Sequence, residues 1–345
     1  MPRIDEKVLD TVFYLYATVD DAKAGAGFGG TGFLVFFPST DGGENSNTNG
    51  WLYAVTNWHV AVRDGFSVLR INSRAGPPDI LEFGPEDWVF DPRFDVAILP
   101  ISLHEKTHKF SVVATRIFTS DFMAANSNIG PGDDVFMAGR FVDHDGGETN
   151  KPAVRFGHIS INPTPMPQGP SQYLADCYCI DVHSRTGYSG SPVFVYRTPG
   201  NTLEDMDRGG MGARQLLTGG INHFSLLGIH FGQFPELWEI EKAKQTPVQE
   251  GLTKGAAPDY VVGMSGMTCV IPSWTIAGVL NMPELKKKRG GKELKLTFGH
   301  HSNRLPDSPK IVEESALPPT DANPNAREDF MRLANAAARK QKPDE

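Results

Sequence analysis

The sequence is poor in cysteine. Only three of its 345 residues are cysteines, too few for the dense disulfide framework of a small secreted protein. Cys177 and Cys179 are two residues apart in a β-like segment, so their side chains share one face and make a poor disulfide pair. Cys269 could bridge only one of them. We therefore expect buried free thiols in a reducing compartment.

The sequence also lacks a long apolar run and a targeting signal. No segment is as long and apolar as a membrane helix, and residues 1–12 have neither the basic start nor the apolar core of a secretory signal. We therefore expect a cytoplasmic protein with no membrane contact. The net charge is -8, which gives the surface as a whole no electrostatic reason to bind nucleic acid.

Turn-forming residues are abundant, with 36 glycines and 26 prolines, and they separate short segments rich in β-branched and aromatic residues. Helical periodicity is scarce before residue 273, where a short amphipathic pattern begins. Strands without interleaved helices favour a barrel or a sandwich over a doubly wound α/β fold. The expected strands cover residues 12–17, 31–37, 51–56, 96–101, 135–138, 154–161, 173–182, 192–196, 226–231 and 267–271.

The composition changes after residue 285. A basic run at residues 286–295 is interpreted as a solvated linker, and residues 302–325 are too rich in Pro, Ser, Asp and Asn to bury much apolar surface. Asn325 and Glu328 have the spacing of a capping box, which predicts a helix over residues 326–340. This largely disordered tail is a candidate binding segment for a protein partner.

Three short patterns occur in a fixed order within this β context. They are TNWHV at residues 56–60, FDVAIL at residues 94–99 and GYSGSP at residues 187–192. A lone histidine or aspartate is usually structural, whereas the glycine-rich serine turn is much more specific. Together they indicate nucleophilic catalysis by a serine.

The residue types fit that chemistry. A serine hydroxyl such as that of Ser189 is a weak nucleophile until a neighbouring base takes its proton, and an imidazole, here that of His59, is the side chain best suited to this role. A carboxylate, Asp95, would fix the tautomer of the imidazole. The glycines allow a tight turn, and we assign the oxyanion hole to the N–H groups of Gly187 and Ser189. No metal or organic cofactor is needed.

These motifs resemble those of the trypsin-like (chymotrypsin-fold) serine peptidases, in particular bacterial members. The resemblance covers roughly residues 12–285 and includes GTGFLV at 30–35 and GDDVFMAG at 132–139. It implies an all-β fold of two antiparallel β-barrels packed face to face. The first, residues 1–115, would supply His59 and Asp95, and the second, residues 116–285, would supply Ser189 and end in a short helix. Residues 286–345 would form the linker and tail.

One departure from the family concerns activation. Digestive members have an aspartate directly before the serine, which pairs with a freed N-terminus, and this chain has Tyr188. We therefore expect no obligatory N-terminal cleavage.

Specificity is read from two short stretches. The string GIHFG at residues 228–232 resembles glutamate-specific members, in which the histidine, here His230, contacts the substrate carboxylate. Phe231 and Gly232 would continue this wall of the pocket, and Ser184 would add a hydroxyl donor. His183 is a further candidate for the pocket floor. The resemblance thus suggests a serine endopeptidase that acts on peptides or proteins, with acidic residues before the cut as one option.

Two alternatives remain. His104–His108 (HEKTH) matches the H-E-x-x-H pattern of zinc peptidases, although its flanks, Pro100 and a β-like segment at 110–113, do not favour the required helix. The fold could also persist as a catalytically latent module that binds peptides or is activated by a partner.

Overall fold

The computed structural model describes residues 3–39, 50–122, 129–142, 147–196, 224–239, 260–292 and 294. The chain divides into two compact units, Met1–Asp307 and Ser308–Glu345. Both sheets described below lie in the first unit. The helix expected over residues 326–340 lies outside the described residues.

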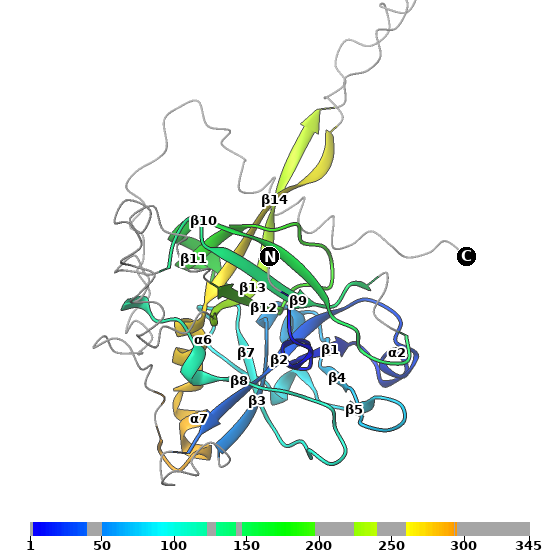
Figure 1. Ribbon diagram of the computed structural model, residues 1–345. Helices are drawn as coiled ribbons and strands as arrows, with labels where there is room; N and C mark the ends of the chain where they lie inside the picture. The colour runs from blue at the N-terminus through cyan, green and yellow to red at the C-terminus, as the bar shows by residue number, and fades with distance from the viewer. Residues whose placement is uncertain are drawn as a thin grey trace, which may run out of the picture. The chain divides into compact units, whose positions relative to one another are not determined.

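The first sheet has eight strands, in the blue-to-cyan part of Figure 1. Its path is β5-β4-β1-β2-β3-β7-β6, and β8 pairs in parallel with β2. All other pairings are antiparallel. The strands are β1 (Val12–Tyr16), β2 (Gly29–Pro38), β3 (Gly50–Thr56), β4 (Val68–Ile71), β5 (Asp79–Leu81), β6 (Val89–Phe90), β7 (Ala97–Ile101) and β8 (Val113–Ala114).

The second sheet is a closed six-stranded barrel in the order β10-β11-β14-β13-β12-β9. Two of its strands, β13 and β14, extend well beyond the barrel in Figure 1. The strands are β9 (Asp134–Gly139), β10 (Ala153–Gln168), β11 (Tyr173–Asp181), β12 (Pro192–Tyr196), β13 (Phe224–Glu239) and β14 (Tyr260–Pro272).

The all-β, chymotrypsin-like architecture expected from the sequence is confirmed, with one refinement. Within the described residues the edges of the first sheet, β5 and β6, do not pair with each other, so this sheet is a curled half-barrel. These edge strands have only three and two residues, which leaves few backbone groups for a closing ladder.

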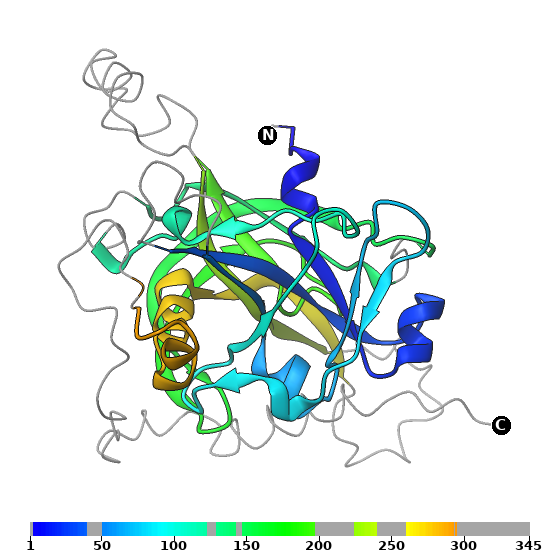
Figure 2. The same cartoon turned by 90° about the horizontal axis from the view of Figure 1, so that it is seen from below.

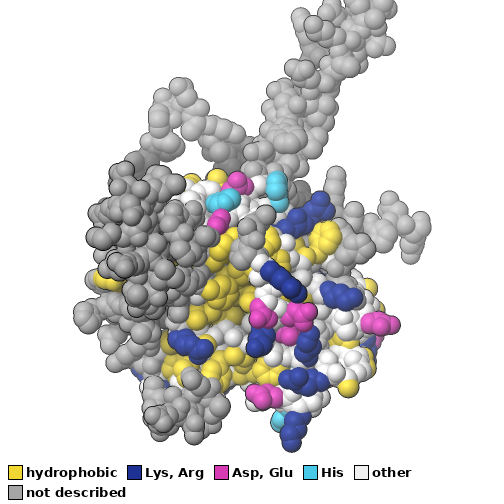
Figure 3. Space-filling view, viewed as in Figure 1, with side chains coloured by type: hydrophobic (Ala, Val, Ile, Leu, Met, Phe, Trp, Pro, Cys, Tyr) yellow, Lys and Arg dark blue, Asp and Glu magenta, His cyan; other side chains and the backbone are white. Residues whose placement is uncertain are grey.

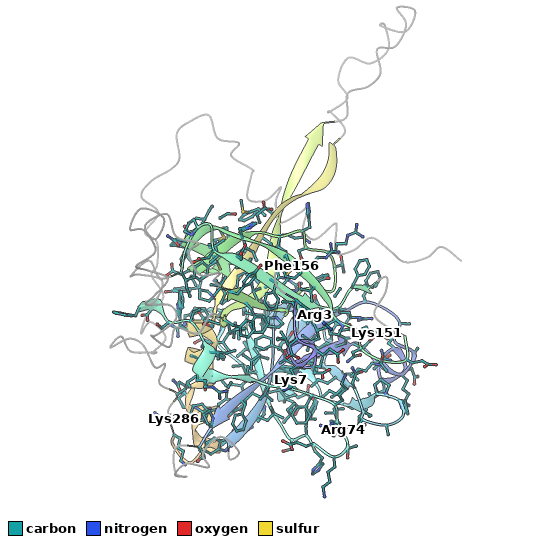
Figure 4. The ribbon with its side chains drawn as sticks, in the orientation of Figure 1. Arg3, Lys7, Arg74, Lys151, Phe156 and Lys286 are labelled. Atoms are coloured by element: carbon teal, nitrogen blue, oxygen red, sulfur yellow. The ribbon has the colours of Figure 1, made fainter. Side chains whose placement is uncertain are left out.

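Apolar side chains join the two sheets. One cluster contains Phe33 and Val35 of β2 together with Phe136 and Phe194 of the barrel. The rings of Phe136 and Phe194 stack at 5.2 Å, and Phe156 of β10, labelled in Figure 4, lies 6.0 Å from Phe136. Separate clusters fill the half-barrel and the barrel. The shared cluster holds the two sheets together, and the cleft described below is lined by residues of both.

The helices described here are short; they lie before the first strand, in the connections between strands and after β14, the last strand of the barrel. Helix α2 was not anticipated, because its six residues are too few to show a helical period. Thr18 accepts a hydrogen bond from the Asp21 N–H, and Gly25 ends the helix with a φ of 65°. The elements are α1 (Glu6–Leu9), α2 (Val19–Ala24), η1 (His59–Arg63), η2 (Pro85–Asp87), η3 (Thr115–Ile117), α6 (Ser273–Leu280) and α7 (Pro283–Lys288).

The single amphipathic helix expected after residue 272 is instead two helices, seen together in Figure 2. Seven of the eight residues of α6 are buried, so it is a core helix without a polar face. Asn281 and Met282 interrupt the helix, and Pro283 begins α7, where its fixed φ suits a first helical position.

The basic run after residue 285 is partly folded, although a solvated linker was expected there. Arg289 is 1% exposed. Its guanidinium lies 4.9 Å from the ring centre of Phe37 and donates a hydrogen bond to the Tyr53 hydroxyl at 3.0 Å. Cation–π contact and this hydrogen bond offset the cost of burying the charge.

The face shown in Figure 3 carries acidic and basic side chains interspersed, next to a patch of apolar side chains. In the described part of the chain, none of the helices is both long and apolar enough to cross a lipid bilayer.

Candidate active site

His59 and Asp95 lie just beyond the ends of two neighbouring strands of the half-barrel. Strand β3 ends at Thr56, opposite Ala97 of β7, so the residues just beyond these ends lie side by side. His59 begins η1, and Asp95 lies two residues before β7. Local pairing within one sheet therefore brings the histidine and the carboxylate together.

The carboxylate of Asp95 accepts two hydrogen bonds from the same residue. Its Oδ2 lies 2.6 Å from His59 Nδ1, and its Oδ1 accepts from the His59 backbone N–H at 2.8 Å. Asn57, which is fully buried, donates to the backbone carbonyl of Asp95 at 2.8 Å. A carboxylate accepts, so Nδ1 donates its proton, and Nε2 of neutral His59 is left with its lone pair.

Ser189 lies in a tight turn before β12. The Tyr188 N–H donates to the Arg185 carbonyl at 3.2 Å, and the Ser191 N–H donates to the Tyr188 carbonyl at 2.9 Å. Gly187 has a φ of 98° at the third position of the first of these turns, which is the type II geometry.

Glycine is also required at position 190 by close packing. Gly190 has a φ of 87°, and a Cβ there would lie 1.9 Å from the Thr31 carbonyl and 2.4 Å from the Thr56 hydroxyl. The turn is thus pressed against β2 and β3 of the half-barrel.

His59 and Ser189 line the same cleft, which has a volume of about 230 Å³. Ser189 is partly exposed. Among the described residues, the N–H groups of Gly187 and Ser189 donate to no backbone carbonyl. Two amide donors without backbone acceptors, one on the serine and one two residues before it, are what binding of an oxyanion requires.

The five residues expected in the substrate pocket are only partly brought together. His230 and Gly232 line the cleft. Phe231 instead packs against the apolar cluster shared by the two sheets. Ser184 is buried, His183 is exposed, and neither is part of the cleft wall. Alternation along β13 explains the position of Phe231, since successive side chains point to opposite faces.

His230 is 2% exposed, and its Nδ1 lies 3.2 Å from the Tyr188 carbonyl. Burial lowers the pKa of His230 to about 4; the Tyr188 hydrogen bond opposes this shift, and the nearby charge of protonated His59 adds to it. His230 is therefore neutral at pH 7. Within the described structure, its Nε2 has no hydrogen-bond partner.

Tyr188, the departure noted from the sequence, points into the barrel. It is fully buried in the barrel cluster, and its hydroxyl accepts a hydrogen bond from Arg155 Nε at 3.3 Å. The side chain thus anchors the serine turn from the barrel side.

The zinc-peptidase pattern is not on a helix. Residues 105–107 form a turn, and the buried His108 contacts Asp79 Oδ2 through Nε2 at 2.9 Å. The His104 N–H donates to His108 Nδ1 at 3.0 Å. The two histidines of the pattern therefore do not share a helical face, which the zinc-peptidase geometry requires.

The expectation of buried free thiols is confirmed: all three cysteines are buried and unpaired. Cys179 lies opposite Cys269 in the ladder of β11 and β14. Burial, followed by the neighbouring Cys179, raises the pKa of Cys269 to about 12. A thiol with such a pKa is protonated at neutral pH and is a poor nucleophile.

Sequence reasoning missed several residues at the site. Thr31, Arg140 and Gln233 were not singled out, although Thr31 stands inside the GTGFLV string. Gln233 lines the cleft, and Thr31 hydrogen bonds to the serine turn. A threonine between glycines gives no signal of its own, because its partners lie about 150 residues away.

No protein-family model matches the chain, and no curated protein matches it in sequence. Among solved structures, Deg5 is 17% identical, with a TM-score of 0.37 over 66% of this chain and 81% of Deg5. The protease Rv3671c of M. tuberculosis, in an inactive form, is 17% identical, with a TM-score of 0.38 and coverage of 79% and 88%. The HtrA-type protease AlgW with a decapeptide is 16% identical, with a TM-score of 0.39 and coverage of 84% and 75%.

Proposed function

We propose that this chain is a serine endopeptidase that cleaves peptide bonds through an acyl-enzyme on Ser189. The observation that supports this most is the meeting of three parts at one cleft. These are a histidine bonded to a buried carboxylate, a serine on a glycine turn, and two amides without backbone acceptors.

The proposed mechanism is acyl transfer. His59 Nε2 takes the proton of the Ser189 hydroxyl as its oxygen attacks the substrate carbonyl carbon. The N–H groups of Gly187 and Ser189 stabilise the resulting oxyanion, and Asp95 stabilises the imidazolium. His59 then gives the proton to the departing amine. Water hydrolyses the ester by the same steps.

We also propose that the side chain before the cut is polar and is recognised by His230. Because the Tyr188 carbonyl can only accept, His230 Nδ1 donates to it, and Nε2 of the neutral ring is an acceptor. A glutamine amide can donate to Nε2 directly. An ionised glutamate can bind only if the complex takes up a proton, so the acidic preference raised by the sequence becomes pH-dependent.

Peptides that differ only in the residue before the cut test both parts of this proposal. We expect hydrolysis of glutamine and glutamate peptides in preference to the lysine peptide. Proton uptake becomes harder as pH rises above the low pKa of His230. The kcat/KM ratio of glutamate to glutamine should therefore rise as pH falls from 8 to 5, by at most about tenfold per pH unit. His183→Ala, at an exposed site outside the cleft wall, is the matched control and should leave the ratio unchanged. A glutamate-to-glutamine ratio that is independent of pH would contradict recognition by His230. If the wild-type protein cleaved none of the peptides, the peptidase assignment would be contradicted.

A further inference from the structure

Thr31 connects the half-barrel to the serine turn of the other sheet. It lies on β2 and is fully buried. Its backbone N–H donates to the Ser189 carbonyl at 2.9 Å, and its hydroxyl donates to the Gly187 carbonyl at 2.6 Å. One residue therefore holds the carbonyls of both residues whose amides we assign to the oxyanion hole.

The direction of the Thr31 hydroxyl hydrogen is fixed by its neighbours. The Arg140 backbone N–H donates to Thr31 Oγ1 at 2.9 Å. An amide N–H can only donate and a carbonyl can only accept, so the single hydroxyl hydrogen is directed to Gly187. The guanidinium of Arg140 lies 4.1 Å from the ring centre of Tyr16, and it donates to the Gly27 carbonyl at 2.9 Å. Thr31 thus lies in a dense buried network.

The remaining carbonyl of the turn is held from the barrel side. The Tyr188 carbonyl accepts from the Ser191 N–H at 2.9 Å and from His230 Nδ1 at 3.2 Å. Three consecutive peptide planes, which begin at Gly187, Tyr188 and Ser189, are therefore held by hydrogen bonds. Their planes set where the Ser189 N–H points.

Gly187 is the weak point of this arrangement. Glycine rotates more freely than any other residue, and its φ of 98° suits a type II turn, which differs from a type I turn by a rotated central peptide. That central peptide contains the Gly187 N–H. Rotation of this peptide would direct the donor away from the cleft, and the Thr31 hydroxyl opposes it by fixing the next plane.

We infer that Thr31 is a positioning residue that holds the Gly187 and Ser189 amides in the orientation that stabilises the oxyanion. The inference rests on the proposed function. It assigns to the half-barrel a second task besides supplying His59 and Asp95: it sets the geometry of a donor pair that belongs to the other sheet.

Thr31→Val tests the inference, because it keeps the shape of the side chain and removes its hydroxyl. Direct loss of one oxyanion donor costs about 10²–10³ in kcat. Since Thr31 acts through the backbone, we expect a smaller loss, of about 10- to 100-fold, with KM within about twofold. The rate of labelling by a fluorophosphonate should fall by a similar factor, because its P=O group uses the same donors. Thr31→Ser keeps the hydroxyl and should restore both rates to within about threefold of wild type.

Thr119→Val is the matched control. Thr119 is also fully buried, and its hydroxyl contacts the Leu227 carbonyl at 3.3 Å and the Ser273 hydroxyl at 2.8 Å, neither of which belongs to the serine turn. It should lose thermal stability as Thr31→Val does, with unchanged kcat. If Thr31→Val does not fold, Thr31→Cys provides the second variant, since a thiol is a weak donor of similar size. A smaller drop in kcat than that expected for valine, with KM unchanged, would then support the inference.

The outcomes separate the two claims. A folded Thr31→Val or Thr31→Cys protein with wild-type kcat, or one in which only KM rises, would overturn the positioning role while the peptidase assignment stands. A wild-type protein that neither hydrolyses peptides nor reacts with the fluorophosphonate would contradict the proposed function itself, and the inference with it.

Discussion

The half-barrel contains two histidine–aspartate pairs that differ in their surroundings. In the first, His59 Nδ1 meets Asp95 at 2.6 Å, and the carboxylate is 7% exposed. In the second, His108 Nε2 meets Asp79 at 2.9 Å, and the carboxylate is 44% exposed. Contact distance alone barely separates them.

The use of the second ring nitrogen separates them clearly. His108 accepts a hydrogen bond from the His104 N–H on Nδ1, so both of its nitrogens are occupied. In the described structure, His59 uses only Nδ1, and its ring borders a cleft that also contains Ser189. A histidine–aspartate pair can act as a base only if the far nitrogen is free to meet a proton donor.

Ser189→Ala should have the largest effect on activity. It removes the proton donor that distinguishes the first pair, and we expect a loss of about 10⁵- to 10⁶-fold in kcat with peptide binding retained. Steady-state kinetics measures the loss of kcat, and thermal melts with and without the peptide report folding and peptide binding. Substantial turnover in a folded variant would show that another group is the nucleophile.

Asp95→Asn tests what the buried carboxylate contributes. An amide NH₂ opposite Nδ1 favours the wrong imidazole tautomer, so we expect a loss of about 10⁴-fold in kcat without unfolding. Proton-detected NMR of the histidine rings would report the tautomer. A variant with both the wild-type tautomer and the wild-type rate would contradict the assigned role of Asp95.

Gly190→Ala tests how closely the serine turn packs against the half-barrel. The added Cβ would meet the Thr31 carbonyl at 1.9 Å, and the φ of 87° disfavours any L side chain. We expect about 3 kcal/mol or more of destabilisation, measured by urea unfolding, together with reduced activity. Gly132→Ala, where a φ of 95° meets open space, is the control for the backbone strain alone. Equal stability of the two variants would mean that the turn does not press on β2 as described.

Asp79→Asn should have the smallest effect, because it alters the second pair. The Asp79 carboxylate is largely exposed to solvent, so we expect less than about 1 kcal/mol of stability to be lost. Activity should stay within about twofold of wild type in the same peptide assay. A large loss of turnover would mean that the HEKTH segment, through His108, contributes to activity.

The sequence predicted most of this molecule where the signal is local. The strands around residues 12–16, 51–56 and 192–196 are marked by β-branched and aromatic residues between turns, and the three motifs mark His59, Asp95 and Ser189. The two-residue strand β6 and the capped helix α2 carry too few residues to show a period.

Long-range hydrogen bonds were beyond the sequence. The bond from Thr31 to Gly187 spans 156 residues, and the packing of Arg289 on Phe37 joins residues still further apart in the sequence. A buried arginine reads as a solvated charge in a linear sequence, since only the fold brings the aromatic ring and the hydroxyl that stabilise it. The expected position of Phe231 in the pocket depended on side-chain direction along β13, which alternates between two faces and changes at a bulge: the register shifts between His230 and Gly232.

Labelling with a fluorophosphonate, followed by peptide mapping of the modified residue, would show whether Ser189 is the activated nucleophile. We expect labelling at Ser189 that a chelator does not affect, that Asp95→Asn strongly reduces and that Asp79→Asn leaves unchanged. Labelling at another residue, sensitivity to the chelator, or equal labelling of Asp95→Asn and wild type would contradict it.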